Sequence, residues 1–395
     1  MRIPWWLRVR AARPAMVRPD TVGAVQPLAA PAGLPAHQGL RALRRALAVL
    51  GLTLLAGCAD LGYYAQSVGG HWQLMRAARP VRDWLAEPAL DPTLRQRLVL
   101  SQALRDFAVR ELHLPDNASY RRYADLGRDA AVWNVVAAPK DSLTPKTWCF
   151  IAVGCVAYRG YFDPAQAQAL ATTLRAQGWE VYVYGVPAYS TLGWLNWMGG
   201  DPLLNTFVNR ADADLAGLMF HELAHQVLYV PDDTAFNESF ATAVQNLGVA
   251  RWMAQHASPA EQAAHQARQQ RRAAFAELTR QTRAELHEIY TKNKPSGQDE
   301  TAVATLKNEA FKRFRAAYAQ RKAAWGGRGE YDAWVAQANN AAFAALAAYD
   351  DWVGAFERLF AREGSDWPRF YDAVRRLAQR PPEQRIKRLT ELKNG

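Results

Sequence analysis

The sequence predicts an α+β fold that is predominantly α-helical, in which a small sheet precedes a helix with candidate metal ligands. Short runs of β-branched and aromatic residues lie between residues 130 and 186, as expected for strands. The pentad His-Glu-Leu-Ala-His at residues 221–225 lies in a helical pattern, and residues 256–325 have the composition of long helices. With 395 residues, half of them hydrophobic, the chain can bury a sizeable core.

Residues 1–57 are predicted to be a leader that takes no part in the fold. Residues 41–58 combine basic residues, a short apolar run and small residues before Cys58, which is the layout of a secretory signal peptide. The apolar run is too short to span a bilayer as a helix. The ending Leu-Ala-Gly-Cys resembles the lipobox of bacterial lipoproteins, in which the cysteine is lipidated and becomes the first mature residue. A short hydrophobic helix with a chance cysteine is the alternative.

The formal charge of +11 does not indicate a nucleic-acid-binding protein. The leader contains eight arginines and one acidic residue, Asp20, so it contributes +7 and leaves +4 for the remaining chain. A balance that small gives no basic footprint for nucleic acid.

Cys149 and Cys155 remain as an even pair once Cys58 is assigned to lipid. Because an exported chain meets an oxidising compartment, a local disulfide is expected between them. Only five residues separate the two cysteines, so the chain must bend there for their Cβ atoms to meet. Two buried free thiols are the alternative.

The first part of the mature chain is predicted to be helical and the next part extended. Apolar residues recur at helical spacing over residues 63–112, which Pro115 closes. A helix with Asp163 as N-cap and Gly178 after its last turn is expected between the second and third predicted strands. These strands are Val132–Val136, Phe150–Tyr158 and Val181–Val186.

The pentad is expected on a helix that begins near Asp212 or Asp214 and runs to about Tyr229. A second helix is expected from about Phe236, after a short turn, so that the two helices pack antiparallel. The order of sheet first and metal helix second is the zincin arrangement, in which the helix lies under a small sheet whose edge strand borders the cleft.

The spacing of His221, His225 and Glu238 predicts a catalytic zinc site. Histidines four residues apart project from one helix face, and Glu238 returns on the second helix as a third ligand. Two imidazoles and one carboxylate leave the fourth position of Zn²⁺ open to water, as catalytic sites require. Glu222 is placed to act as general base. The alternative is a solvated helix face without metal.

Two further sets of residues are candidates for contact with a substrate. Tyr189 and Ser190 are expected on an edge strand that pairs with an extended peptide, and a plain turn that buries Trp194 is the alternative. Stabilisation of an oxyanion needs a second donor besides the metal. Its candidates, among which the sequence does not choose, are Tyr290, Tyr331, Tyr349 and His287.

Residues 256–325 are expected to form a long helical hairpin, solvated over much of its surface. The alternative is that this hairpin is an arm that binds a partner or faces the membrane. The predicted organisation is a leader and signal peptide, a zincin-like catalytic core, the hairpin, and C-terminal helices packed on the core, over residues 1–57, 58–255, 256–325 and 326–395.

The mature chain resembles a bacterial family of predicted lipoprotein aminopeptidases, gluzincin-like zinc metallopeptidases. The resemblance implies His221, His225 and Glu238 as zinc ligands and Glu222 as the base. It covers essentially residues 58–395 and is carried by Leu55–Cys58, Trp148–Phe150 with Gly154-Cys155, Tyr158–Phe162, Ala188–Trp194, Asp201–Leu204, Phe220–Gln226 and Phe236–Ala241.

The chain departs from familiar gluzincins in two respects. The gap between His225 and Glu238 is shorter than in the thermolysin and aminopeptidase N families. Thr242 stands where thermolysin-like enzymes place an Asp that orients a ligand histidine, and Asn237 or Asp233 could replace that Asp. No segment matches the Gly-x-Met-Glu-Asn motif that binds a free amino terminus.

These patterns predict a zinc-dependent peptidase of the bacterial envelope, with aminopeptidase activity implied by the resemblance. The expected partners are a peptide or protein substrate and the membrane, through a lipid anchor at Cys58; nucleic acid is not expected, and no oligomeric state is predicted. The protein would face the periplasm, and Ala59 favours the outer over the inner membrane. The alternatives are a binding or scaffolding lipoprotein with a structural or vestigial metal site, and an endopeptidase acting on envelope substrates.

Overall fold

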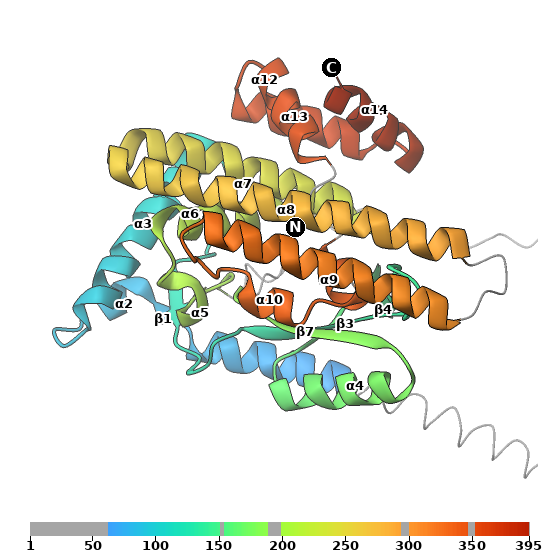
Figure 1. The fold of residues 1–395 in the computed structure, drawn as a ribbon. Coiled ribbons are helices and arrows are strands. Elements are labelled where there is room, and N and C mark those ends of the chain that lie inside the picture. Colours follow the sequence, from blue (N-terminus) through green and yellow to red (C-terminus); the bar gives the residue numbers. More distant parts are fainter. Residues whose placement is uncertain (1–61, 151–153, 189–198, 294–299, 347–351, 395) are drawn as a thin grey trace, which may run out of the picture. The chain divides into compact units, whose positions relative to one another are not determined.

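Helices make up most of the described chain and small sheets the rest, which confirms the prediction of a predominantly α-helical α+β fold (Figure 1). The computed structural model describes residues 62–150, 154–188, 199–293, 300–346 and 352–394. Cys58, Tyr189, Ser190 and Tyr349 lie outside these residues. In the described part of the chain, no helix combines the length and the apolarity needed to cross a membrane.

The helical stretch expected over residues 63–112 is divided into three helices. A helix over residues 62–77 is followed by β1 (Arg79–Pro80), α2 (Val81–Leu85) and α3 (Pro92–Leu112). Proline has no N–H to donate and fixes its own φ, so Pro80 and Pro92 are found at element boundaries. Asp91 caps α3 by accepting a hydrogen bond from the Leu94 amide at 2.8 Å.

The central sheet is antiparallel and has helices on both faces. β3 (Val132–Ala138) pairs with β6 (Arg159–Tyr161) and with β7 (Glu180–Val186). Side chains alternate along β3, so Val135 and Ala137 pack against α4 (Pro164–Ala176), whereas Val136 and Ala138 pack against α11 (Asn340–Leu346). Figure 1 shows α4 along one face of the β3–β7 pair. The predicted strands at 132–136 and 181–186 are therefore confirmed, and so is the helix between Asp163 and Gly178.

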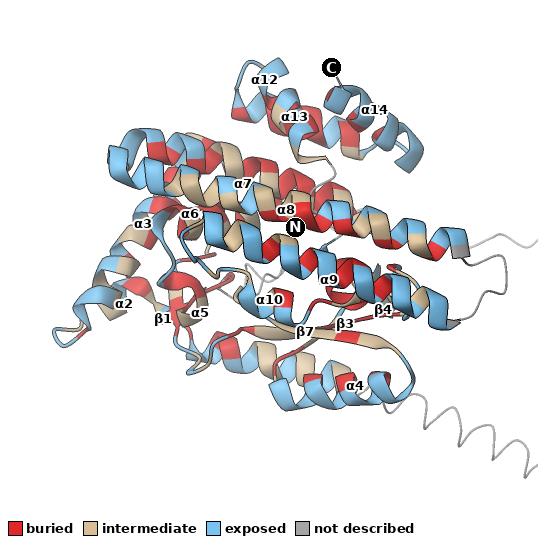
Figure 2. Ribbon diagram, viewed as in Figure 1, coloured by how far each residue is buried: buried red, intermediate tan, exposed pale blue. Residues whose placement is uncertain are grey.

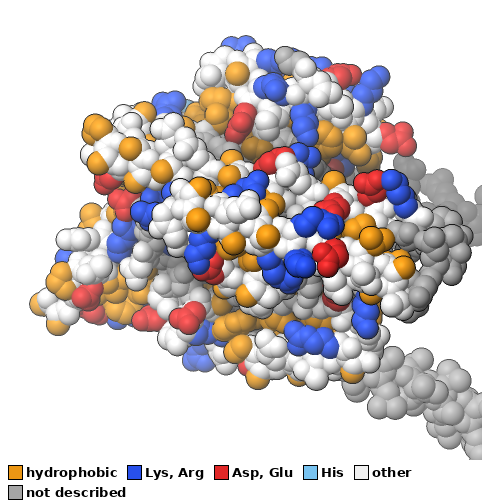
Figure 3. Space-filling view, in the orientation of Figure 1, with side chains coloured by type: hydrophobic (Ala, Val, Ile, Leu, Met, Phe, Trp, Pro, Cys, Tyr) orange, Lys and Arg blue, Asp and Glu red, His pale blue; other side chains and the backbone are white. Residues whose placement is uncertain are grey.

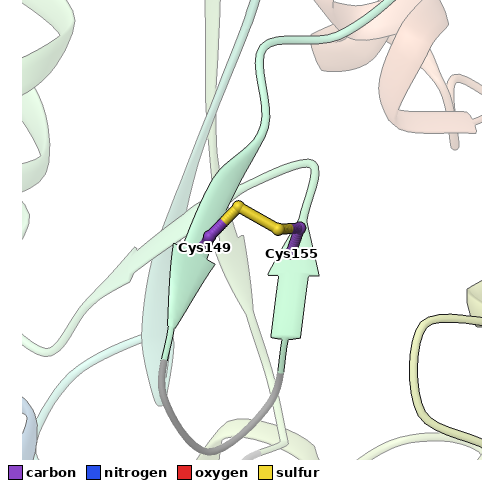
Figure 4. Close-up of a disulfide and its surroundings, with 2 residues drawn as sticks. All are labelled: Cys149 and Cys155. Atoms are coloured by element: carbon purple, nitrogen blue, oxygen red, sulfur yellow. A yellow bond between two sulfur atoms is a disulfide. The ribbon is translucent and has the colours of Figure 1, made fainter.

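The single strand expected over Phe150–Tyr158 is wrong. The chain instead forms a hairpin of β4 (Trp148–Phe150) and β5 (Gly154–Val156), and β6 begins only at Arg159. Gly154 has φ of 73°, a conformation that glycine adopts without strain and that breaks an extended run. Cys149 and Cys155 face each other across the hairpin and form a disulfide (Figure 4).

A third sheet joins the N-terminal region to the segment before the pentad. β2 (Arg122–Ala124) lies between β1, which it pairs antiparallel, and β8 (Leu203–Leu204), which it pairs parallel. The short helix α5 (Asn205–Val208) follows β8 directly.

The two helices that carry the pentad and Glu238 lie in the largest core. α6 (Asp212–His225) ends four residues before the expected Tyr229, and α7 (Thr234–His256) begins at the Asp233 N-cap. α12 (Val353–Arg362) and α13 (Trp367–Ala378) pack on α7 through aromatic rings, and Phe236 lies 5.1 Å from Phe356 between ring centroids. α14 (Pro382–Asn394) completes the C-terminal group.

α8 (Pro259–Asn293) and α9 (Glu300–Ala324) form the predicted helical hairpin, and α10 (Asp332–Ala336) lies beside them. A second apolar core holds them together, which the sparse large apolar residues of this segment did not predict; it includes Phe275, Leu286, Phe314, Tyr318 and Phe343. Most residues on the visible face of α9 are exposed (Figure 2). Acidic and basic side chains are interspersed over the face that α8 and α9 form (Figure 3).

Candidate metal centre

His221, His225 and Glu238 meet between α6 and α7. The Nε2 atoms of the two histidines lie 3.2 Å apart, and Nε2 of His221 lies 3.2 Å from Oε2 of Glu238. Nε2 of His225 lies 3.7 Å from Oε1 of the same carboxylate. All the ligand atoms of the three residues lie within 4.8 Å of one another. The structure thus brings together the three residues that the spacing singled out.

A tight turn delivers Glu238 to the two histidines across the short gap. The side chain of Asn237 accepts a hydrogen bond from the Val230 amide at 2.8 Å and donates one to the Val230 carbonyl at 2.7 Å. Asp233 accepts a hydrogen bond from the Phe236 amide at 3.1 Å and caps α7. Because Asn237 immediately precedes Glu238, this clamp fixes the ligand's position on the first turn of α7.

The distances fit a four-coordinate zinc ion. Zn²⁺ binds imidazole nitrogen and carboxylate oxygen at about 2.0–2.2 Å, so neighbouring ligands of a tetrahedral site are separated by roughly 3.3 Å. The three separations of 3.2, 3.2 and 3.7 Å are close to that edge. Two nitrogens and one carboxylate are also the donor set of open, catalytic zinc sites.

The surroundings set the protonation of the three residues. Burial and, after it, the charge of His221 lower the pKa of His225 to about 4, although the charge of Glu238 opposes them. Burial raises the pKa of Glu238, but the hydrogen bond from His221 and the charges of both histidines outweigh it and lower that pKa overall. At neutral pH these two residues therefore have the states that bind a cation, neutral imidazole and ionised carboxylate.

His221 is the member of the set that retains a proton most readily. Burial lowers its pKa, but hydrogen bonding to Glu238, the charges of Glu222 and Glu238, and hydrogen bonding to Gln245 raise it above its ordinary value. A metal ion must displace this proton when it binds below that pKa.

Glu222 is half-buried on α6 next to His221. Tyr120, which is 1% exposed, shares its environment: burial raises the pKa of Tyr120 strongly, and the charge of Glu222 raises it further. Tyr120 also has a left-handed backbone with φ of 64°. Glu222 therefore lies beside a candidate metal ligand, and its role as general base stays a prediction.

The predicted oxyanion candidates that the structure describes lie along a neighbouring cleft. Tyr290 is buried and donates a hydrogen bond to Oδ1 of Asn340 at 2.8 Å, and the Tyr331 ring stacks on Phe275 at 3.9 Å. Both residues and His287 line a cleft of about 1480 Å³, whose α7 wall includes Thr242 and Gln245. Their proposed role as donors stays a prediction.

Three tyrosines that the sequence analysis did not single out share the environment of Glu238. Burial raises the pKa of Tyr158, Tyr184 and Tyr229, and the charge of Glu238 raises each of them further. Tyr184 lies on β7, and its hydroxyl accepts a hydrogen bond from Asn134 at 3.3 Å. Tyr158 lies between β5 and β6, and Tyr229 lies in the segment between α6 and α7. No local pattern in the sequence marks these tyrosines, because the approach of Tyr158 and Tyr184 to Glu238 depends on tertiary structure.

The disulfide hairpin contacts the turn between the two helices that carry the candidate ligands. A Cβ built on Gly154 would lie 2.2 Å from Oδ1 of Asp232, which itself has φ of 61°. Only glycine allows so close an approach. The bridge between Cys149 and Cys155 therefore stabilises a hairpin that abuts the turn leading to Glu238 (Figure 4).

The chain matches the model of a protein family described as Putative aminopeptidase. The match covers residues 62–389 and so includes α6, α7 and all the candidate ligands. No curated protein and no solved structure matches the chain.

Proposed function

We propose that this chain, which belongs to the family described as Putative aminopeptidase, hydrolyses peptide bonds with one zinc ion. The observation that carries the proposal is the convergence of His221, His225 and Glu238, with Nε2–Nε2 and Nε2–Oε2 distances of 3.2 Å. A zincin-type site of this kind keeps a coordination position open for the reaction. Glu222 lies beside these ligands on α6.

Each residue has a defined part in such a reaction. His221 and His225 would hold the ion through Nε2, and Glu238 would hold it through its carboxylate. Zn²⁺ supplies the Lewis acid that lowers the pKa of water and polarises a carbonyl. Glu222 accepts the proton of the attacking water and returns it to the leaving amine as the C–N bond breaks. The proton is thereby transferred without any other acid or base.

A peptide digest tests this function and distinguishes its two forms. Wild-type protein and the Glu222→Gln variant are incubated with an unstructured peptide and with the same peptide acetylated at its amino terminus. An aminopeptidase produces a ladder from the free amino terminus and leaves the acetylated peptide intact, whereas an endopeptidase cuts both internally. If neither peptide is cut by the zinc-loaded wild type, the proposed function is wrong.

We also propose that the protein is anchored in the bacterial envelope through Cys58 and faces the periplasm. The support is the signal-peptide layout of residues 41–58 and its Leu-Ala-Gly-Cys ending. The Cys58→Ser variant should leave the membrane fraction, and its retention there would contradict the anchor.

A further inference from the structure

We infer that Gln245 is a positioning residue, whose side-chain amide orients the His221 imidazole so that Nε2 points to the metal. The inference rests on the proposed metal site and extends it beyond the three ligands and the base. Neither the pentad nor the spacing of Glu238 singles out this residue.

The first support is the geometry of two antiparallel helices. Gln245 follows Glu238 by seven residues on α7, so the two side chains project from the same face two turns apart. Along an antiparallel partner, the position two turns beyond Glu238 lies opposite the turn of α6 that precedes His221. Gly217, four residues before His221, occupies that turn.

The second support is the room that Gly217 provides. A Cβ built on Gly217 would lie 3.2 Å from Cγ and 3.3 Å from Nε2 of Gln245, tighter than ordinary carbon contacts. Glycine inside a helix costs about 1 kcal/mol relative to alanine. Because Gly217 has no Cβ, the Gln245 amide has room to lie against α6 near His221.

The third support is the contact between the amide and the imidazole. The Gln245 side chain lies close enough to His221 to be among the groups that raise its pKa, after Glu238 and Glu222 and against burial, which lowers it. The buried Nδ1 atom of His221 has no hydrogen-bond partner among the residues that the structure describes. We assign Oε1 of Gln245 as the acceptor for Nδ1–H, because catalytic hydrogen bonds are often long or poorly aligned until the site holds its ligand.

This contact has a chemical consequence at the other ring nitrogen. When Nδ1 carries the proton and donates it to an acceptor, the lone pair of Nε2 is free for the metal. A neutral amide fixes this tautomer without adding a negative charge next to Glu238. Gln245 also lines the cleft, so its side chain stands between the cleft and His221.

The two residues that the sequence offered for this task have other partners. Asn237 uses its amide on both backbone groups of Val230. Asp233 caps α7 and forms an ion pair with Arg385 at 2.8 Å. Thr242 lines the cleft and provides a control position on the same helix, three residues before Gln245.

The test compares isosteric variants by their zinc affinity and unfolding temperature. Gln245→Met keeps the shape that packs on Gly217 but removes the acceptor, whereas Thr242→Val removes a hydroxyl of the same helix. We expect Gln245→Met to lower zinc affinity by about 10–100-fold, with the unfolding temperature of the metal-free protein unchanged. Gln245→Glu, which restores an acceptor, should recover much of the affinity, and Thr242→Val should match wild type.

A double-mutant cycle separates positioning from simple packing. Gly217→Ala should displace the amide and lower zinc affinity in the wild-type background, but have little further effect in the Gln245→Met background. Additive effects of the two substitutions would contradict the inference. So would a Gln245→Met variant that binds zinc within a factor of about two of wild type. Absence of zinc binding by the wild type would instead overturn the proposed function itself.

Discussion

Two antiparallel helix pairs in this chain differ in where their polar side chains lie: one pair encloses a polar cluster, and the other has most of its charges at the surface. α6 and α7 enclose His221, His225 and Glu238, which converge on one point within a large apolar core. α8 and α9 pack through their own aromatic core and place most of their charges at the surface, where Arg313 pairs with Glu285 and Arg280 with Glu277. Figure 3 shows acidic and basic groups interspersed over that face.

The difference shows where function constrains the sequence. Burying an imidazole pair and a carboxylate costs free energy unless the groups are paired or hold a metal. The exposed ion pairs of α8 and α9, such as Arg313 with Glu285, avoid this cost because water solvates them. Apolar residues would be less costly at the buried positions of α6 and α7. The buried polar cluster is therefore a better indication of a functional site than the many charges of the hairpin.

The largest effect is expected from removal of a ligand. His221→Ala should lose stoichiometric zinc, because two remaining ligands bind far more weakly than three, and the loss should exceed the 10–100-fold typical of residues that only orient a ligand. Metal content after exchange against a weak chelator measures it. His265→Ala on α8 is the control and should retain zinc; equal zinc content in both variants would remove His221 from the site.

A substitution in the core at α7 should lower the free energy of unfolding much more than a substitution at the surface of α9. Phe240 is fully buried among Phe356, Phe370 and Tyr371, so Phe240→Ala should lower the free energy of unfolding by about 3–5 kcal/mol. Leu306→Ala on α9, where the residue is 44% exposed, should change it by less than about 0.5 kcal/mol. Urea unfolding of the metal-free variants compares them, and similar losses would break the contrast between the two helix pairs.

Zinc affinity should fall in acid because of His221. Its pKa is raised, so below that pKa the metal-free site holds a proton that zinc must displace, and affinity should drop about tenfold per pH unit. His225, whose pKa is about 4, should compete only when the pH approaches that value, and the lowered pKa of Glu238 keeps its carboxylate ionised at higher pH. The same raised pKa stabilises the metal-free fold below the unfolded pKa of histidine, and this stabilisation is lost as the pH rises through the folded pKa. Competition titrations across pH measure the affinity, and a flat profile would contradict this prediction.

The smallest effect is expected at the surface of the hairpin. Arg313 and Glu285 join α9 to α8 by an ion pair whose side chains are 58% and 38% exposed. Arg313→Ala should reduce the free energy of unfolding by less than about 1 kcal/mol, and less still at high salt. A double-mutant cycle with Glu285→Ala isolates the pair, and a coupling above that limit would show that the hairpin depends on its charges.

Local patterns predicted the elements and the convergence of the three candidate ligands better than the contacts between elements. Helical spacing alone placed His221 and His225 on one face, and Glu238 needed only a short turn. The strand over Phe150–Tyr158 was mispredicted because the bend at Gly154 depends on its approach to Asp232.

The contacts around the ligands depend on tertiary structure. Gln245 was missed because seven-residue spacing marks it only when the packing of α7 on α6 is known. Tyr184 was missed because it approaches Glu238 from β7, far away in the sequence.

The central claim is that α6 and α7 form a zinc-dependent catalytic site with Glu222 as its base. Zinc content and peptide turnover of wild type and Glu222→Gln, measured on the same preparations, test it most directly. We predict about one zinc per chain in both proteins and a loss of turnover of about 10²–10⁴-fold in the variant. Wild type without zinc, or a Glu222→Gln variant that cleaves peptide as fast as wild type, would contradict the claim.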